Sequence, residues 1–101
     1  MNKLLRKRII GDIAHSNNNF AVNVHNSLGH ESKKLEIYYN LTKEGHDVRT
    51  EVKMKSGKGI FDILDITTGK IYEILYSETL AEAKQKVTKY PDYLDIEFIQ
   101  V

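Results

Sequence analysis

The second half of the chain shows the clearest pattern of hydrophobic and polar positions. Residues 48–54 alternate, with Val48, Val52 and Met54 among the apolar members, which predicts a half-buried strand. Residues 60–66 and 71–76 are two apolar runs separated by the turn sequence 67–70, which contains Gly69, and they predict a hairpin. Residues 94–98 alternate again and predict a last strand.

Two segments show helical spacing. A helix is predicted to begin near His30 or Glu31 and to run to Lys43, followed by Gly45 as a stop signal; its apolar members are Leu35, Tyr38 and Leu41. A second helix follows Thr79, which has capping-box spacing to Glu82, and ends before Pro91; its apolar members are Leu80, Ala83, Val87 and Tyr90. Residues 30–101 therefore predict an α/β fold in the order helix–strand–strand–strand–helix–strand, with a mixed central sheet flanked by helices.

The first part of the chain has a different character. Residues 1–13 form a weakly amphipathic basic segment, and the alternation of Phe20, Val22 and Val24 indicates a short strand. We interpret residues 1–29 as a basic N-terminal extension that acts as an arm or as a dimer element. Residues 30–101 would then form the single folded domain.

Composition limits the possible classes of protein. The 101 residues suffice for one domain with a modest core, and the net charge of +1 gives no general signature of polyanion binding. The chain has no cysteine, which excludes disulfides and thiolate zinc sites. Its apolar stretches are too short to span a membrane, and no signal peptide is evident, so we expect a cytoplasmic protein without membrane contact.

Two acids stand in the predicted hairpin and need an explanation. Asp62 and Glu73 lie in the middle of the two apolar runs, and a turn at residues 67–69 places them opposite each other to within about one residue of register. Directly opposed residues have Cβ atoms about 5 Å apart. Carboxylates at that distance repel unless one is protonated or a cation lies between them. Mg²⁺ or Mn²⁺ is the cation we expect, because carboxylate and water oxygens are the ligands that Mg²⁺ takes. The alternative is a solvated edge position or a pairing with lysine.

The order of the elements resembles that of the PD-(D/E)xK nuclease superfamily, over roughly residues 30–101. The sequence Gly59-Ile60-Phe61-Asp62-Ile63-Leu64 looks like the strand that carries the motif aspartate, without its preceding proline, and Tyr72-Glu73-Ile74-Leu75 looks like the strand with the second acid. His30-Glu31-Ser32-Lys33-Lys34 resembles the start of the first helix, which often carries an acid. The resemblance implies a restriction-endonuclease-like fold and a Mg²⁺-dependent endonuclease acting on DNA. It also implies that Asp62 and Glu73 bind the metal and that Glu31 assists.

One position departs from this family pattern. Two residues after Glu73, where the motif lysine is expected, the chain has Leu75, which can neither activate water nor stabilise negative charge. Lys84 in the second helix is our candidate for a substitute, with Lys70 and Lys53 as weaker ones. The competing interpretation of Lys84 is a solvated lysine on the outer helix face.

Several basic residues could form a rim that contacts phosphates, since phosphate neutralisation supplies much of the affinity for nucleic acids. They are Lys33, Lys34, Arg49, Lys53, Lys55 and Lys58. An ordinary solvated face is the alternative. We expect His30 to be an exposed neighbour of the helix cap; the alternative is a residue that contacts a phosphate or acts as an acid or base. We assign tyrosines such as Tyr76 to packing rather than to base stacking.

Two other functions compete with a nuclease. Leu75 motivates the first, a nuclease-like fold without catalysis that binds nucleic acid or protein. The second is a double-stranded-RNA-binding domain, which shares part of the element order. The acidic segment 77–82 and the surplus last strand argue against it, because such domains start their second helix with a lysine-rich turn.

Overall fold

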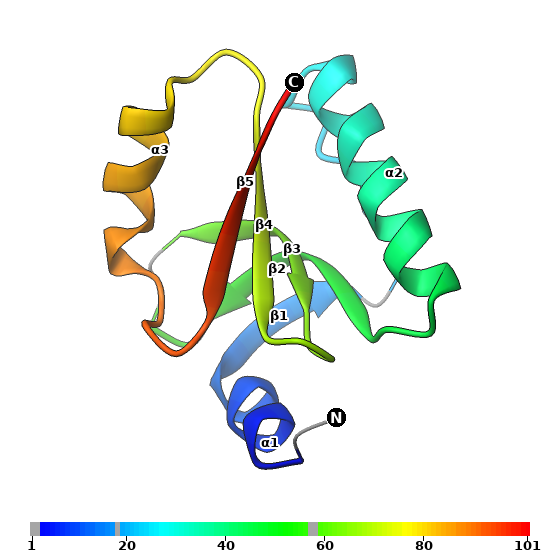
Figure 1. Ribbon diagram of the computed structural model, residues 1–101, viewed down its shortest axis with the longest axis vertical. Coiled ribbons are helices and arrows are strands. Elements are labelled where there is room, and N and C mark those ends of the chain that lie inside the picture. Colours follow the sequence, from blue (N-terminus) through cyan, green and yellow to red (C-terminus); the bar gives the residue numbers. More distant parts are fainter. Residues whose placement is uncertain (1–2, 18, 57–58) are drawn as a thin grey trace.

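The computed structural model describes residues 3–17, 19–56 and 59–101 (Figure 1). The described residues form three α-helices, a short 3₁₀ helix and five strands. In chain order these are α1 (Lys3–Asp12), β1 (Ile13–Asn17), α2 (Leu28–Lys43), β2 (Val48–Met54), β3 (Ile60–Asp65), β4 (Lys70–Leu75), α3 (Leu80–Lys86), η1 (Val87–Lys89) and β5 (Asp95–Gln100). The helix–strand–strand–strand–helix–strand order predicted for residues 30–101 is confirmed from α2 to β5.

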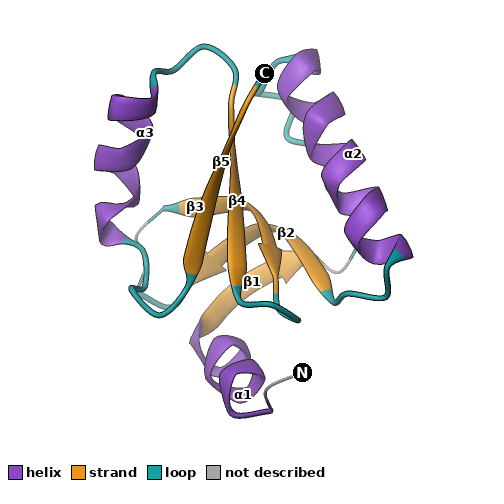
Figure 2. Cartoon of the chain, viewed as in Figure 1, coloured by secondary structure: helices purple, strands orange, loops and turns teal. Residues whose placement is uncertain are grey.

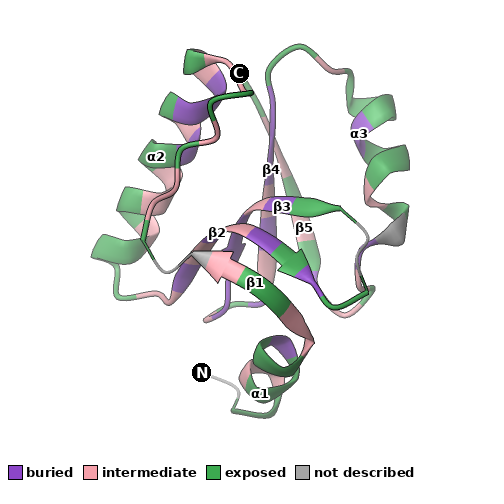
Figure 3. Cartoon of the chain, turned by 180° about the vertical axis from the view of Figure 1, so that it is seen from behind, coloured by how far each residue is buried: buried purple, intermediate pink, exposed green. Residues whose placement is uncertain are grey.

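The strands form one mixed sheet in the order β1-β2-β3-β4-β5. Strands β1 to β4 pair antiparallel, as short connections allow, and β5 pairs parallel to β4 after the chain has crossed over through α3. Helices α2 and α3 lie on opposite sides of β4 and β5 (Figure 2). Strand β4 is buried along most of its length, whereas the outer surface of α3 is exposed (Figure 3). The α/β class with a mixed sheet is thus confirmed.

The helix ends follow their local signals. Ser27 caps α2 by accepting a hydrogen bond from the His30 N–H, and Gly45, at a φ of +88°, follows its C-terminus. Thr79 and Glu82 form the predicted capping box of α3. The α-helix ends at Lys86, earlier than predicted, and η1 carries the chain to the extended residue before Pro91.

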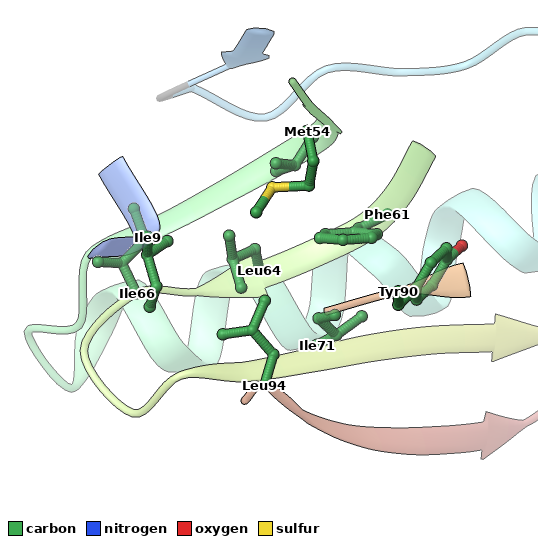
Figure 4. Packing of buried hydrophobic residues seen from close by; sticks show 9 residues of the cluster. Ile9, Met54, Phe61, Leu64, Ile66, Ile71, Tyr90 and Leu94 are labelled. Carbon is green, nitrogen blue, oxygen red and sulfur yellow. The ribbon is translucent and has the colours of Figure 1, made fainter. Parts of the chain in front are cut away.

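The hydrophobic core has two parts, one on each face of the sheet. The larger part includes Ile9, Phe61, Leu64, Ile71 and Tyr90 (Figure 4). The smaller part, under α2, contains the residues Val48, Ile63 and Ile74, with Ile37, Tyr38 and Leu41 packed against it. Because both faces are covered, β3 and β4 have the near-continuous apolar runs that the sequence shows.

Residues 3–17 belong to this fold rather than to a separate extension. Strand β1 pairs with β2, and Ile9 of α1 is fully buried in the larger core. Two basic residues of the segment also contact the rest of the fold: Arg6 forms an ion pair of 2.8 Å with Asp47, and Arg8 lies over the Tyr93 ring. The division of the chain at residue 29 therefore does not correspond to a structural boundary. Its suggested role as a dimer element stays a prediction.

The strand predicted around residues 20–24 is absent; this described segment is a loop that lies over α2 and β2. Its backbone groups bind side chains instead of a neighbouring strand. Thr50 Oγ1 accepts from the Ala21 N–H at 3.2 Å, Lys34 Nζ donates to the Ala21 carbonyl at 2.7 Å, and Glu31 Oε1 accepts from the Asn23 N–H at 2.6 Å. No described helix has the length and apolar character needed to cross a membrane.

In β2 and in the paired part of β3, the buried side chains switch from one face of the sheet to the other. The alternating sequence pattern did not predict this switch. Val48 packs under α2, but Val52 packs in the core on the other face. Between them Glu51 has a φ of +50°, a conformation that costs energy in a residue other than glycine. The pairs Thr50–Ile63 and Val52–Phe61 on either side place Glu51 opposite Asp62. The strained residue therefore lies beside one of the two hairpin acids.

Candidate functional site

Asp62 and Glu73 lie where β3 and β4 separate. The described ladder between these strands ends at the pair Ile63–Tyr72, and one further step in the same register places Asp62 opposite Glu73. Beyond that pair, Asp62 Oδ2 accepts a hydrogen bond of 3.0 Å from the Ile74 N–H. The side chain thus replaces a backbone acceptor at the fork between the strands. The two acids are close enough for the Asp62 carboxylate to act on the pKa of Glu73, in keeping with the opposition predicted from the turn.

Glu73 is a buried acid without full compensation. The residue is 2% exposed, and its Oε1 has no hydrogen-bond partner among the described residues. Burial, followed by the charge of Asp62, raises the pKa of Glu73 to about 8. The Tyr90 hydroxyl faces this carboxylate, and burial together with the charge of Glu73 raises the pKa of Tyr90 as well. A proton on Glu73 or a cation would compensate the two acids. Among the described residues, no group of three or more His, Asp or Glu side chains is placed to hold a metal ion.

His30 links Asp62 to Glu31. Its Nδ1 lies 2.7 Å from Glu31 Oε2, and its Nε2 lies 3.3 Å from Asp62 Oδ2. Contact with the Asp62 carboxylate, opposed by burial and reinforced by Glu31, raises the pKa of His30. Because both ring nitrogens face carboxylates, the doubly protonated imidazolium is the favoured form. The prediction of an exposed His30 is wrong, since α2 begins two residues earlier than expected and turns this side chain inward.

Glu31 is fully occupied by protein partners. In addition to His30 and the Asn23 N–H, its two oxygens accept from Lys34 Nζ at 2.9 Å and from Asn26 Nδ2 at 3.3 Å. Burial alone would raise the pKa of Glu31, but the hydrogen bonds from the Asn23 N–H, Lys34 and His30 outweigh it and lower the pKa. We therefore assign Glu31 to orienting His30 rather than to holding a metal, because no oxygen is left for an ion.

A polar pocket of about 250 Å³ opens beside Asp62. Its described lining comes from the loop before α2, the start of α2, β3, β4, the segment after β4, and α3. The lining residues are His25, Asn26, Ser27, His30, Asp62, Ile74, Tyr76, Ser77, Glu78 and Lys86. The lysine in this lining is Lys86 and not the predicted Lys84, which is exposed elsewhere on α3. The charge of Lys86 also reaches Glu73, where it opposes the rise in pKa that burial causes.

The position of Lys86 along α3 gives one sequence signal that favours it over Lys84. Lys86 follows the buried Ala83 by three residues, a helical spacing that puts it on the same side of α3 as Ala83, and its exposed side chain lines the pocket there. Leu75, at the place of the motif lysine, is 1% exposed and belongs to the interior. The strand itself therefore supplies no cation there.

The predicted basic rim is not assembled as one surface. Lys34 is completely buried, and Lys33 forms an ion pair of 2.9 Å with Glu36. Arg49 donates from Nε to Asp47 at 3.0 Å. Lys53 and Lys55 are exposed on and after β2, and Lys58 lies outside the described residues. Lys34 in particular cannot contact a phosphate, because its ammonium group is enclosed by Glu31, the Ala21 carbonyl and the Phe20 ring.

Comparisons of the chain with protein-family models, with curated proteins and with solved structures gave no match.

Proposed function

We propose that the protein is a metal-dependent nuclease that hydrolyses phosphodiester bonds in DNA. The observation that carries this proposal is the buried Glu73 carboxylate with an unpartnered oxygen, placed beside Asp62 at the fork of β3 and β4. The order of elements from α2 to β5 supports it, since it resembles the PD-(D/E)xK nuclease superfamily.

Asp62 and Glu73 would hold Mg²⁺ or Mn²⁺, which when bound supplies a Lewis acid for a phosphate oxygen and lowers the pKa of coordinated water. The chain's own residues have separate tasks. Lys86, at the pocket wall, offsets negative charge on the phosphate in place of the motif lysine. His30, held by Glu31, fixes the orientation of the Asp62 carboxylate.

A second candidate function follows from one observation. Leu75 is buried at the place of the motif lysine, so the site would lack a cation on the strand itself. A protein that keeps the fold and the acids but only binds DNA or a protein would fit this feature equally. The two candidates make opposite predictions for cleavage.

The first experiment measures cleavage of linear, branched, flapped and single-stranded DNA with and without Mg²⁺. We expect Mg²⁺-dependent cleavage that is lost in Asp62→Asn and in Glu73→Gln and retained in Asp92→Asn, which changes an exposed acid in the turn before β5. Cleavage that survives both site variants would contradict this site. Metal and DNA binding without any cleavage would favour the binding module.

The second experiment tests the assignment of the lysine with a matched pair from α3. Lys86→Met should lower kcat by about 10²-fold, as expected when a group that stabilises transition-state charge is removed. Lys84→Met, which removes an exposed lysine from the same helix, should leave kcat close to that of the unaltered protein. The reverse result would restore the assignment of Lys84 made from the sequence.

A further inference from the structure

Tyr76 lies at the mouth of the pocket with its ring accessible. It directly follows β4 and lines the same pocket as Asp62, His30 and Lys86. The residue is 51% exposed, although it sits at the end of a buried strand. The sequence-based assignment of this tyrosine to core packing is therefore wrong, because the chain leaves the sheet at this residue.

The backbone of α2 supports the ring from one side. A Cβ atom added at Gly29 would come within 2.4 Å of Tyr76 Cε2, so the ring lies against the bare backbone of the first turn of α2. Any side chain at position 29 would displace it. The ring therefore has a contact with α2 while half of the residue stays accessible.

The pocket beside this ring is small and polar. Its volume of about 250 Å³ lies below the usual range of 300–1,000 Å³ for sites that enclose a whole organic ligand. It can take a phosphate group with part of a sugar but not a base pair. Lys86 offers positive charge to that phosphate, against the negative charge of Asp62 and of Glu78 in the same lining.

We propose that the exposed face of Tyr76 stacks on an unpaired base next to the phosphate in the pocket, so that the site takes single-stranded or frayed DNA. This inference rests on the proposed function and names its substrate class. Bases inside an intact duplex are stacked on both sides, and their faces are closed to a protein ring, whereas an unpaired base offers its face to an aromatic side chain.

The test uses single-stranded oligonucleotides that carry the fluorescent base 2-aminopurine at successive positions, in Ca²⁺ so that binding is separated from cleavage. We expect Tyr76→Leu to weaken binding about 5- to 150-fold, the range for loss of one stacked base, and Tyr76→Phe to bind like the unaltered protein. Fluorescence quenching confined to one position should vanish in Tyr76→Leu only. Tyr39→Leu, at an exposed tyrosine on the outer face of α2, is the matched control and should change neither readout.

Unaltered affinity and quenching in Tyr76→Leu, with the fold verified by its melting temperature, would overturn the inference. Equal or tighter binding of a blunt duplex of the same length would also overturn it. The failure of the proposed function looks different, since the protein would then bind single strands through Tyr76 but cleave none of them in Mg²⁺.

Discussion

At the scale of single residues, Glu73 dominates the behaviour of the molecule. Burying a carboxylate beside another acid is unfavourable unless a proton or a cation compensates. With its pKa raised to about 8, Glu73 carries a proton in the folded protein at neutral pH when no metal is present. The site is thus held in place by the surrounding core at the expense of stability.

This raised pKa predicts how stability changes with pH. The pKa of Glu73 is above the value of about 4.5 for the unfolded chain, so the stabilising proton is fully effective below pH 4.5 and is lost as the pH rises to about 8. We expect Glu73→Gln, which stays neutral, to be more stable than the unaltered protein at pH 8–9 without metal, by roughly 1–3 kcal/mol. Urea unfolding at several pH values measures this difference.

A different result would contradict the raised pKa of Glu73. If the two proteins keep the same difference in unfolding free energy from pH 4 to pH 9, Glu73 does not titrate in this range. Saturating Mn²⁺ provides the control. A ligand that binds only the folded state should raise the free energy of unfolding of the unaltered protein and leave that of Glu73→Gln unchanged.

At the scale of elements, the buried pair of Lys34 and Glu31 attaches the loop of residues 19–27 to α2. Lys34 is completely buried and lies 2.9 Å from Glu31 Oε1 and 3.7 Å from Glu51 Oε2. Removing one partner of such a pair leaves an uncompensated charge in the interior, which costs more than the pair itself contributes. The same interaction keeps Glu31 in position to hold His30.

Lys34→Met should therefore lower the free energy of unfolding by about 3–5 kcal/mol. Lys33→Met, which removes a neighbouring lysine whose ion pair with Glu36 is partly exposed, should change it by less than about 1 kcal/mol. Chemical denaturation compares the two variants. Equal effects would mean that the buried contacts of Lys34 contribute nothing beyond those of a surface lysine.

Two glycines give a matched comparison of backbone conformation. Neither has a heavy atom within 4 Å of an added Cβ, but Gly45 has a φ of +88° after α2, whereas Gly11 lies within α1. Gly45→Ala should destabilise the protein by about 1 kcal/mol because alanine is strained there, and Gly11→Ala should stabilise it by about 0.5–1 kcal/mol. Melting temperatures that shift in the same direction for both would contradict the described geometry.

At the scale of the whole molecule, the N-terminal segment completes the sheet and the core. Ile9 is fully buried among residues that come from β3, β4 and the turn between them, including Leu64, Ile66 and Ile71. Strand β1 covers the edge of β2. Exposing this surface would leave apolar residues in water and an unpaired strand edge.

Ile9→Ala should accordingly lower the free energy of unfolding by about 2–5 kcal/mol, the usual range for truncating a buried aliphatic side chain. Ile10→Ala, at the exposed neighbouring position, is the control and should change stability by less than about 0.5 kcal/mol. A chain lacking residues 1–17 should lose cooperative unfolding as followed by circular dichroism. Cooperative unfolding of that truncated chain would restore the interpretation of this segment as a dispensable arm.

Most of the helices and strands could be predicted from the sequence, whereas the surroundings of the site could not. The apolar periods and the turn and cap residues of α2, β2 to β4, α3 and β5 are local signals, and each placed its element in the correct order. The pattern of residues 20–24 predicts a strand, but these residues form a loop, because their backbone partners are side chains distant in the chain, such as Thr50 and Lys34. An alternating pattern of apolar residues cannot indicate whether the backbone groups form hydrogen bonds with a neighbouring strand or with side chains.

By itself, the sequence determined that two acids would oppose each other in a hairpin, since the turn length and register are local properties. Only the tertiary structure decided what surrounds them. It enclosed Glu73, turned His30 inward, placed Lys86 rather than Lys84 at the pocket, and buried Lys34. The physical reason is that burial and charge compensation depend on which elements pack together, and residues far apart in the chain meet only when the sheet and its helices are assembled.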